Sequence, residues 1–379
     1  MLLILYKTVL LKILFPLEYY YPSMIDGKGT SIYLLTKELS SCGLDISIIS
    51  SPKGIEIQNL DTNRHYKKYN LKVKFLKESF FKHINFNQVK YVSNSDVIHF
   101  SSFFYKLTIW YFILALILKK KIVISPRGEF YLPALKRKTF IKKIYIKLFK
   151  IFQKKINFHA TNDYEKKLIQ NFFPKCKIEV IPNLIDAPKI FSSKKNNNLL
   201  FLGRINPIKN IDVLIEAYSN LKSEFKDKFS LIIVGEAFLD YEKKYLEQLK
   251  ILIKTKQLEN KIKFLGPIYG TEKFKIISKS FCLILPSKSE NFGNVVLEAI
   301  SQNTPVIASE NTPWKILKDN KAGYWVPPNV NSINKALNNI ITSDKVKYSN
   351  IQNNAMKLLK TRFSFKNNIS LWKKYYSDL

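Results

Sequence analysis

The sequence predicts an α/β protein of two domains, each built on a doubly wound parallel sheet. Short apolar segments alternate with segments of helical periodicity along most of the chain, which is the pattern of repeated βαβ units. A run without apolar residues, SSKKNNN at 192–198, has the composition of a linker between the two halves. A chain of 379 residues is also long enough for two separate hydrophobic cores.

The first predicted domain covers residues 1–190. It opens with a βαβ unit: a strand at 12–17, a polar loop, a helix over 31–43 that ends at a glycine, and a strand at 45–50. Two interpretations of Met1–Leu11 stay open, a native start of the chain and a non-native extension ahead of this unit. The later segments are the strands 96–100 and 121–125, the buried helix 107–118, and a strand end with its helix at 158–169.

The second predicted domain covers residues 191–363. Its strands are expected at 199–202, 230–236, 261–268 and 283–285, and a helix begins near 293–294. Parallel sheets of this kind bind ligands at the carboxyl ends of their strands. The residues that follow each strand are therefore the candidates for a functional site.

Composition limits the classes of function. A hydrophobic content of 46% excludes general disorder, and the net charge of +33 indicates an anionic partner such as nucleic acid, an anionic membrane face or a phosphate-bearing substrate. Cys42, Cys176 and Cys282 lie far apart, without metal or disulfide spacing, as in a reducing compartment, and Cys282 is expected in a core strand. The longest apolar run has twelve residues, whereas about 20 are needed to span a bilayer.

The basic charge is concentrated at 136–155, which holds nine basic residues and no acidic one. Apolar residues at 140, 141, 144, 145, 148 and 152 share one helical face, and the lysines occupy another. Two interpretations stay open: an ordinary surface helix packed on a core, or a basic amphipathic helix that lies on an anionic bilayer.

The chemistry is expected to centre on LILPSKSENFGNVVLEAISQNTPVI, residues 283–307. A strand runs through a Pro-Ser turn and a loop with Glu290 into a helix that begins near Gly293, and Glu298 lies one turn inside that helix. Free N–H groups at a helix start bind phosphate oxygens. Either carboxylate alone could be a solvated acid, but together they suit a ligand with phosphates and several hydroxyls, such as a nucleotide-sugar.

Two cations, Arg204 and Lys209, follow the predicted strand 199–202. They are placed to neutralise a diphosphate, the arginine through its planar fork and the lysine as a point charge. The alternative is a pair of solvated cations.

Resemblance to a known family adds specific roles. The ENFGNVVLE segment resembles the E-x7-E signature of retaining glycosyltransferases of family 4, which have the GT-B fold. Gly203-Arg204 and Lys209 resemble the family's Gly-Arg and Lys-Gly element, with Asn210 in place of the second glycine. The segment from Ser125 resembles the SPRG-type segment of a subgroup that builds surface polysaccharides.

The resemblance implies two Rossmann-like domains that face each other across a cleft. The first would bind the acceptor, with a C-terminal helix at 364–379 packing back on it, and the second would bind the nucleotide-sugar. Glu290 would contact donor-sugar hydroxyls and Glu298 the ribose. The expected catalytic residues are Glu290, Arg204 and Lys209, and the expected donor-binding residues are Gly203, Glu298, Phe292, Gly293, Asn294, Val295 and Gly27.

Four residues at strand ends of the first domain are candidates for acceptor contacts: Gly29, His99, Arg127 and Glu129. Three of them have a simpler alternative, namely turn chemistry for Gly29, a structural role for His99, and a surface carboxylate for Glu129. Many relatives place a catalytic-site histidine where Arg127 stands, and the surface-polysaccharide subgroup keeps the arginine. No catalytic base is assigned.

The predicted function is transfer of a sugar, with retention at the anomeric carbon, from a nucleotide-sugar to a lipid-linked saccharide of lipopolysaccharide, O-antigen or capsule synthesis. No metal or cofactor is expected, because no Asp-x-Asp motif is present and the nucleotide-sugar is a substrate. The expected location is cytoplasmic, on the inner face of the cell membrane. Alternatives are a nucleotide-sugar epimerase, a catalytically silent GT-B scaffold and, less favoured because no nucleic-acid-binding motif is evident, a nucleic-acid-binding protein.

Overall fold

The computed structural model describes residues 10–23, 27–52, 66–76, 86–136, 139–192 and 194–379. The interpretation of Met1–Leu11 as an extension therefore falls almost entirely outside the described residues. The chain divides into two compact units, Met1–Leu184 with Phe365–Leu379, and Ile185–Ser364. The change of unit lies at 184/185 and 364/365, whereas the positions expected from the sequence are 190/191 and 363/364.

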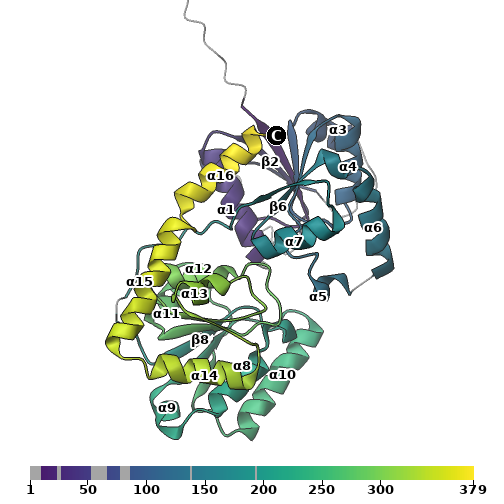
Figure 1. The fold of residues 1–379 in the computed structure, drawn as a ribbon. Coiled ribbons are helices and arrows are strands. Elements are labelled where there is room, and N and C mark those ends of the chain that lie inside the picture. The colour runs from purple at the N-terminus through teal and green to yellow at the C-terminus, as the bar shows by residue number, and fades with distance from the viewer. Residues whose placement is uncertain (1–9, 24–26, 53–65, 77–85, 137–138, 193) are drawn as a thin grey trace, which may run out of the picture. The chain divides into compact units, whose positions relative to one another are not determined.

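Unit 1 is a seven-stranded parallel sheet with helices on both faces (Figure 1). The strand order is β3-β2-β1-β4-β5-β6-β7. In chain order the elements are β1 (Lys12–Leu17), α1 (Gly27–Ser41), β2 (Asp45–Ser50), β3 (Lys72–Phe75), α3 (Phe86–Ser93), β4 (Val97–Phe100), α4 (Thr108–Ile117), β5 (Lys121–Ile124), α5 (Leu132–Leu135), α6 (Thr139–Ile151), η3 (Gln153–Lys155), β6 (Ile156–Ala160), α7 (Asp163–Phe172), β7 (Lys177–Val180) and α16 (Phe365–Ser377).

The two faces of this sheet carry separate cores. Neighbouring residues of one strand face opposite sides, so Ile13 and Phe15 of β1 belong to one core and Leu14 to the other. Strands buried on both faces must be apolar along their whole length, which is why they were recognised as short apolar runs. The helix α16 contributes Trp372 and Tyr376 to the core that also holds α1.

The glycine pair of the first strand-to-helix connection lies in a helix and not in a loop. Helix α1 begins at Gly27, four residues before the expected start, so Gly27 and Gly29 form its first turn. Because glycine has a low helix propensity, the residues around Gly27 and Gly29 did not look helical in the sequence. The predicted start of the helix was therefore too late. A Cβ built on Gly29 would lie 3.1 Å from the Tyr19 ring, so close packing, and not a turn, favours a glycine there.

Unit 2 is a six-stranded parallel sheet of order β10-β9-β8-β11-β12-β13. Its elements are β8 (Asn198–Leu202), η4 (Pro207–Lys209), α8 (Ile211–Ser219), α9 (Ser223–Lys228), β9 (Ser230–Val234), α10 (Asp240–Thr255), β10 (Ile262–Phe264), α11 (Gly270–Lys279), β11 (Cys282–Leu285), α12 (Asn294–Ser301), β12 (Val306–Ser309), α13 (Lys315–Asp319), β13 (Tyr324–Val326), α14 (Val330–Ile341) and α15 (Lys345–Thr361).

The same alternation builds two cores in unit 2. Leu199 and Phe201 of β8 face one core, and Leu200 faces the other. Cys282 is fully buried in β11, as expected. Because β8 and β11 are parallel neighbours, paired at Leu199 and Cys282, their carboxyl ends lie side by side. The two sheets confirm the prediction of two Rossmann-like α/β domains.

Candidate functional site

The first part of the site is the turn after β8. Gly203 and Arg204 follow this strand directly, and a Cβ built on Gly203 would lie 4.0 Å from Lys209 Cε. Gly235, after the neighbouring β9, has φ +155°, and a Cβ there would lie 1.9 Å from the Gly203 carbonyl oxygen. A side chain at Gly235 would therefore displace the backbone that carries Arg204. The requirement for this glycine comes from a contact between two strand ends, which sequence spacing does not reveal.

Lys209 lies on a short turn that is tied to the loop after β11. The turn is η4, capped by the Asn206 side chain, which accepts a hydrogen bond from Ile208 N at 2.9 Å. Asn210 follows with φ 59° and ψ 39°, a left-handed conformation that asparagine tolerates better than most residues. Its side-chain amide donates to the Pro286 and Pro328 carbonyl oxygens at 3.2 and 3.1 Å. Asparagine thus satisfies the backbone geometry at the family's glycine position and adds two hydrogen bonds.

Lys209 and Glu290 form an ion pair at the centre of the site. Lys209 Nζ lies 2.5 Å from Glu290 Oε1, and the hydroxyl of Ser287 donates to the same oxygen at 2.8 Å. The two charged side chains are only 20% and 12% exposed. Ser287 was not among the residues singled out from the sequence, although it belongs to the Pro-Ser turn. The structure therefore brings together two of the three expected catalytic residues in direct contact.

The start of α12 lies beside this pair. Its N-cap, Gly293, has φ +77°, and a Cβ there would lie 3.0 Å from Leu285 and 3.9 Å from Glu290 Cγ. Phe292 is buried against Trp314, whose Nε1 donates to the Phe292 carbonyl at 2.5 Å. The Phe292 ring therefore packs in the core of unit 2 under the loop. Because it is buried, the ring cannot make the expected donor contact.

The expected donor-binding residues Asn294 and Val295 form the first turn of α12. The leading N–H groups of a helix have no intrahelical acceptor, and the positive end of the dipole lies with them. This helix start is therefore suited to phosphate oxygens.

Glu298 also has a cationic partner. Lys273 of α11 lies 2.8 Å from Glu298 Oε1, and both side chains are largely buried, 18% and 12% exposed. No motif indicated Lys273, because the pairing depends on the packing of α11 against α12. Each of the two signature carboxylates thus faces a lysine from another segment of unit 2.

Glu129, one of the expected residues of unit 1, holds the loop after β4. Glu129 accepts hydrogen bonds from the Ser102 hydroxyl and from the backbone N–H groups of Phe103 and Phe104, the latter two at 2.5 and 3.1 Å. It also lies 3.7 Å from Lys28 Nζ. Glu129 is therefore bound into the loop after β4 and is not the simple surface carboxylate of the alternative interpretation.

Arg127 lies in the turn after β5 and has φ +51°. Its Nη1 donates to Asn183 Oδ1 at 3.2 Å. Gly128, the next residue, has φ +85°, so two successive left-handed residues make the turn. Its N–H donates to the buried carboxylate of Glu165 at 2.7 Å.

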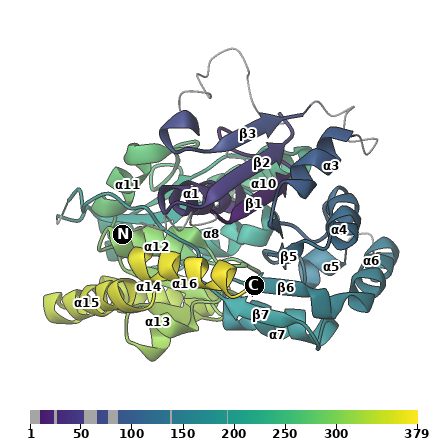
Figure 2. The same ribbon diagram turned by 90° about the horizontal axis from the view of Figure 1, so that it is seen from above.

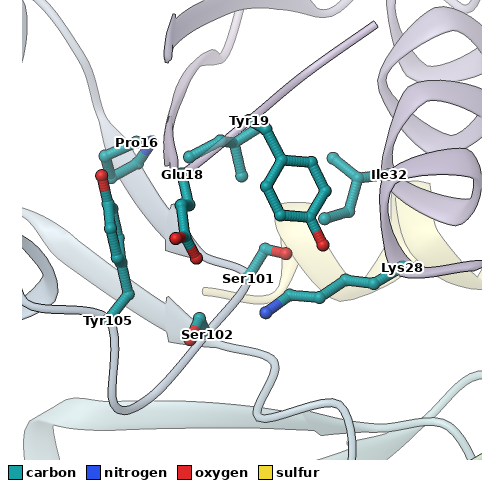
Figure 3. A pocket seen from close by; sticks show the side chains of 9 residues that line it. Pro16, Glu18, Tyr19, Lys28, Ile32, Ser101, Ser102 and Tyr105 are labelled. Carbon is teal, nitrogen blue, oxygen red and sulfur yellow. The ribbon is translucent and has the colours of Figure 1, made fainter. Parts of the chain in front are cut away.

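A small pocket lies at the carboxyl ends of β1 and β4 (Figure 3). The rings of Tyr19 and Tyr105 stand on opposite sides of it, with the Glu18 carboxylate and the Lys28 ammonium between them. Ser101 and Ser102 complete its polar lining, and Pro16, Leu17 and Ile32 its apolar lining. Gly29 is adjacent to this pocket through its contact with Tyr19. Aromatic walls with a few polar groups between them are typical of small-molecule sites.

His99 does not contribute to this pocket, because it is fully buried. Its Nδ1 accepts from the Tyr376 hydroxyl of α16 at 2.5 Å, and its Nε2 donates to Ser125 Oγ at 2.7 Å. Ser125 donates to His159 Nδ1 at 2.8 Å, and His159 Nε2 donates to the Ile181 carbonyl at 2.8 Å. The Ile181 carbonyl can only accept, so His159 must carry its proton on Nε2. With neutral rings, this fixes the donor and the acceptor of each of the other three hydrogen bonds.

Burial lowers the pKa of both histidines, that of His99 well below its ordinary value and that of His159 to about 3. Both rings are therefore neutral near pH 7. The expectation that His99 contacts an acceptor is wrong, because its two ring nitrogens join α16 to the sheet.

The basic segment also differs from its predicted pattern. Helix α6 packs on the core through Phe149, which stacks on Phe112 of α4 at 4.1 Å between ring centroids. Phe140, Ile141 and Ile144, which were expected on the same face as Tyr145 and Phe152, are instead 52–76% exposed. The apolar residues of α6 are thus divided between two faces.

A second exposed apolar strip lies next to α6. It comes from α4, the helix beside α6 in Figures 1 and 2, and consists of Trp110, Ile113 and Ile117. None of the described helices has both the length and the hydropathy required to cross a bilayer.

Comparisons with known proteins concern the family and the fold of this chain. Residues 184–358 match the family profile described as glycosyl transferases group 1, and residues 25–188 match that of glycosyltransferase family 4. The O-antigen chain mannosyltransferase RfbU of Salmonella typhimurium is 29% identical over 60% of this chain and 62% of its own length. The N-acetylgalactosamine-N,N'-diacetylbacillosaminyl-diphospho-undecaprenol 4-alpha-N-acetylgalactosaminyltransferase of Campylobacter jejuni is 30% identical over 48% and 49%. The matches span about half to three fifths of these curated relatives.

Solved structures match over a longer range. Anabaena HepE, solved in complex with UDP and glucose, superposes with a TM-score of 0.80 over 97% of this chain and 100% of its own, at 18% identity. WaaG, described as a glycosyltransferase involved in lipopolysaccharide biosynthesis, gives a TM-score of 0.64 over 92% and 95%, at 15% identity. At these identities the likeness concerns the fold. Together, the two profile matches and the two sheets show that the chain belongs to the group 1 glycosyltransferases of family 4, which have the GT-B fold.

Proposed function

We propose that this protein transfers a sugar from a nucleotide-sugar to a lipid-linked saccharide during synthesis of a surface polysaccharide such as lipopolysaccharide, O-antigen or capsule. The observation that carries the proposal is the Lys209–Glu290 ion pair beside the start of α12 and the Gly203-Arg204 turn. Two cations and a helix start at one place suit a diphosphate, and the adjacent carboxylate suits sugar hydroxyls.

The proposed reaction breaks the bond between the anomeric carbon and the diphosphate oxygen. The electron pair of that bond stays on the nucleoside diphosphate, and the acceptor hydroxyl oxygen forms the new bond to the anomeric carbon and loses its proton. Arg204, Lys209 and the N–H groups of α12 would stabilise the charge that develops on the diphosphate. Because these groups supply the positive charge, the proposed reaction needs no metal.

Retention at the anomeric carbon is part of the proposal, supported by the match to family 4. Attack then comes from the side of the leaving group, so the departing diphosphate oxygen is the nearest base for the proton of the acceptor hydroxyl. This route is consistent with the absence of any assigned side-chain base.

Acceptor binding is proposed for the pocket of unit 1 between Tyr19 and Tyr105 (Figure 3). Aromatic rings can cover the apolar faces of a saccharide, while Glu18, Lys28 and Ser102 can bond to its hydroxyls. Glu129 accepts hydrogen bonds from the Ser102 side chain and from the backbone of the next two residues, so it fixes the position of Ser102 in the pocket lining.

The cytoplasmic face of the cell membrane is the proposed location, with α4 and α6 in contact with anionic lipid. Phe140, Ile144 and Ile151 are exposed on α6 next to exposed lysines, and Ile117 is exposed on α4. Apolar side chains that insert among acyl chains and lysines that face lipid phosphates are the two components of interfacial binding.

This location can be tested with vesicles. Changing Phe140, Ile144 and Ile151 to serine should reduce sedimentation with vesicles of phosphatidylglycerol and phosphatidylcholine at least about ten-fold. A control with Ile251, Leu265 and Val346 changed to serine removes equally exposed apolar side chains from unit 2 and should bind like the unaltered protein. Equal loss in both variants, or no binding by the unaltered protein at low salt, would contradict the proposal.

The reaction is tested in two stages. Thermal unfolding with UDP, GDP and ADP identifies the base, since a ligand that binds the folded state raises the melting temperature. The nucleotide-sugars of that base are then incubated with a lipid-linked acceptor, and the products are separated. A new glycoside supports transfer, interconversion of nucleotide-sugars supports an epimerase, and binding without either product supports a silent scaffold.

A further inference from the structure

A buried carboxylate lies behind both cations of the proposed donor site. It belongs to Glu242 in the first turn of α10, and its side chain is 0% exposed. Arg204 Nε lies 3.2 Å from Glu242 Oε1, while the Arg204 side chain is 36% exposed. Among the residues that the structure describes, no other acidic side chain lies within ion-pair distance of Arg204. The inner side of the guanidinium thus faces Glu242, and its outer part faces solvent.

The second cation is connected to the same carboxylate through Asn206. The Asn206 amide donates to Glu242 Oε1 at 2.5 Å, and its carbonyl oxygen accepts from Ile208 N at 2.9 Å. Asn206 therefore joins Glu242 to the turn η4, which ends at Lys209. The amide nitrogen has two N–H donors and also donates to the Tyr241 hydroxyl at 3.0 Å, so the Asn206 side chain joins the turn to both Tyr241 and Glu242 of α10.

Glu242 is stabilised as a carboxylate. Its Oε2 accepts from the backbone N–H groups of Phe238 and Leu239 at 3.0 and 3.1 Å. Burial by itself would raise the pKa of Glu242, but the hydrogen bonds from Asn206, Leu239 and Phe238 and the charge of Arg204 outweigh it and lower the pKa. A buried charge with this many donors is fixed in place, because any movement would leave it without partners.

We propose that Glu242 is a positioning residue for the donor diphosphate, which aims Arg204 directly and Lys209 through Asn206. The inference rests on the proposed function, since it concerns the same diphosphate site. Without Glu242, Arg204 would keep its charge but lose its fixed direction, and the turn that carries Lys209 would lose one of its anchors, while the hydrogen bonds of Asn210 remain. Preorganised donors bind a charged group better than mobile ones, because no ordering is needed when the ligand arrives.

A simpler possibility is that Glu242 only caps α10. The two possibilities differ in what the removal of the charge does to diphosphate binding. The test variant is Glu242→Gln, which keeps the volume of the side chain. The control is Asp344→Ala, which also removes one negative charge and a helix cap within unit 2, where Asp344 accepts from Lys347 N at 2.7 Å.

Binding is measured by titration calorimetry with whichever of UDP, GDP and ADP stabilises the unaltered protein most, and with its nucleoside. Glu242→Gln should weaken binding of the nucleoside diphosphate at least ten-fold and leave that of the nucleoside unchanged, while Asp344→Ala should change neither. In a double-mutant cycle with Arg204→Ala, the two losses should be less than additive, because both remove the same aimed guanidinium.

Three results would overturn the inference: diphosphate binding by Glu242→Gln within two-fold of the unaltered protein, equal loss for diphosphate and nucleoside, or additive losses in the cycle. If Glu242→Gln does not fold, Asn206→Ala tests the connection to Lys209 and should weaken diphosphate binding at least five-fold; unchanged binding would again overturn the inference. If the unaltered protein binds no nucleoside diphosphate, the proposed function itself fails, which is a separate outcome.

Discussion

Replacing Lys209 and Glu290 singly, and then together, separates a catalytic role of this ion pair from a structural one. Lys209 Nζ and Glu290 Oε1 are 2.5 Å apart, and the side chains are 20% and 12% exposed. Lys209→Met or Glu290→Gln leaves one largely buried charge without its partner. We expect each single variant to lose about 1–3 kcal/mol of unfolding free energy. The double variant leaves neither charge unpaired, so it should be more stable than the sum of the two losses predicts.

Activity should follow a different order from stability. Each single variant should lower the transfer rate at least about ten-fold, which corresponds to about 1.4 kcal/mol in the barrier. The double variant should stay at least that low, because it lacks both the cation for the diphosphate and the carboxylate for the sugar. Unfolding in urea measures stability, and release of nucleoside diphosphate from the nucleotide-sugar measures the reaction. Recovery of activity together with stability in the double variant would refute the catalytic assignment of both residues.

Three further predictions concern the scaffold. Gly235→Ala should lower the free energy of unfolding by about 3 kcal/mol, because the new Cβ would lie 1.9 Å from a backbone oxygen. Gly270→Ala should lower it by only about 1 kcal/mol, because Gly270 has φ +56° but no atom within 4 Å of the Cβ. Equal melting temperatures of the two variants would contradict this prediction. The free energy of unfolding should fall from pH 6.5 toward pH 3, because His159 binds a proton below about pH 6.5 in the unfolded chain but only near its pKa of about 3 in the folded protein. The slope is at most about 1.4 kcal/mol per pH unit for each such histidine. A urea midpoint that does not change between pH 7 and pH 5 would contradict this prediction. Tyr376→Phe removes the proton that His99 Nδ1 accepts, so it should cost about 1–3 kcal/mol in urea unfolding, and an unchanged midpoint would argue against the hydrogen bond.

Much of the fold followed from hydrophobic patterning. The expected strands 12–17 and 45–50 coincide with β1 and β2, and the expected helix at 107–118 with α4 to within one residue at each end. Central parallel strands are buried on both faces, so their sequences are apolar throughout and easily located. The start of α1 was placed late because glycine lowers the helical pattern locally, although packing against Tyr19 favours glycine there.

Contacts between distant segments account for what the sequence did not predict in the site. Glu242 and Lys273 carry no motif, and each matters only because folding brings it to Arg204 or Glu298. Ser287 belongs to the Pro-Ser turn, but its hydrogen bond to Glu290 was not predicted from the sequence. Two carboxylates with seven residues between them are visible in a sequence, but their partners in space are not.

The sequence by itself determined the fold class, the positions of the strand ends, and the residues that resemble a family signature, because periodicity and short motifs are local properties of the chain. The tertiary structure alone decided which side chains are buried and which charges face each other. It placed His99 in a core, turned Phe140 and Ile144 of α6 outward, and set Glu242 behind Arg204. The physical reason is that burial and ion pairing depend on packing between elements that are far apart in the sequence.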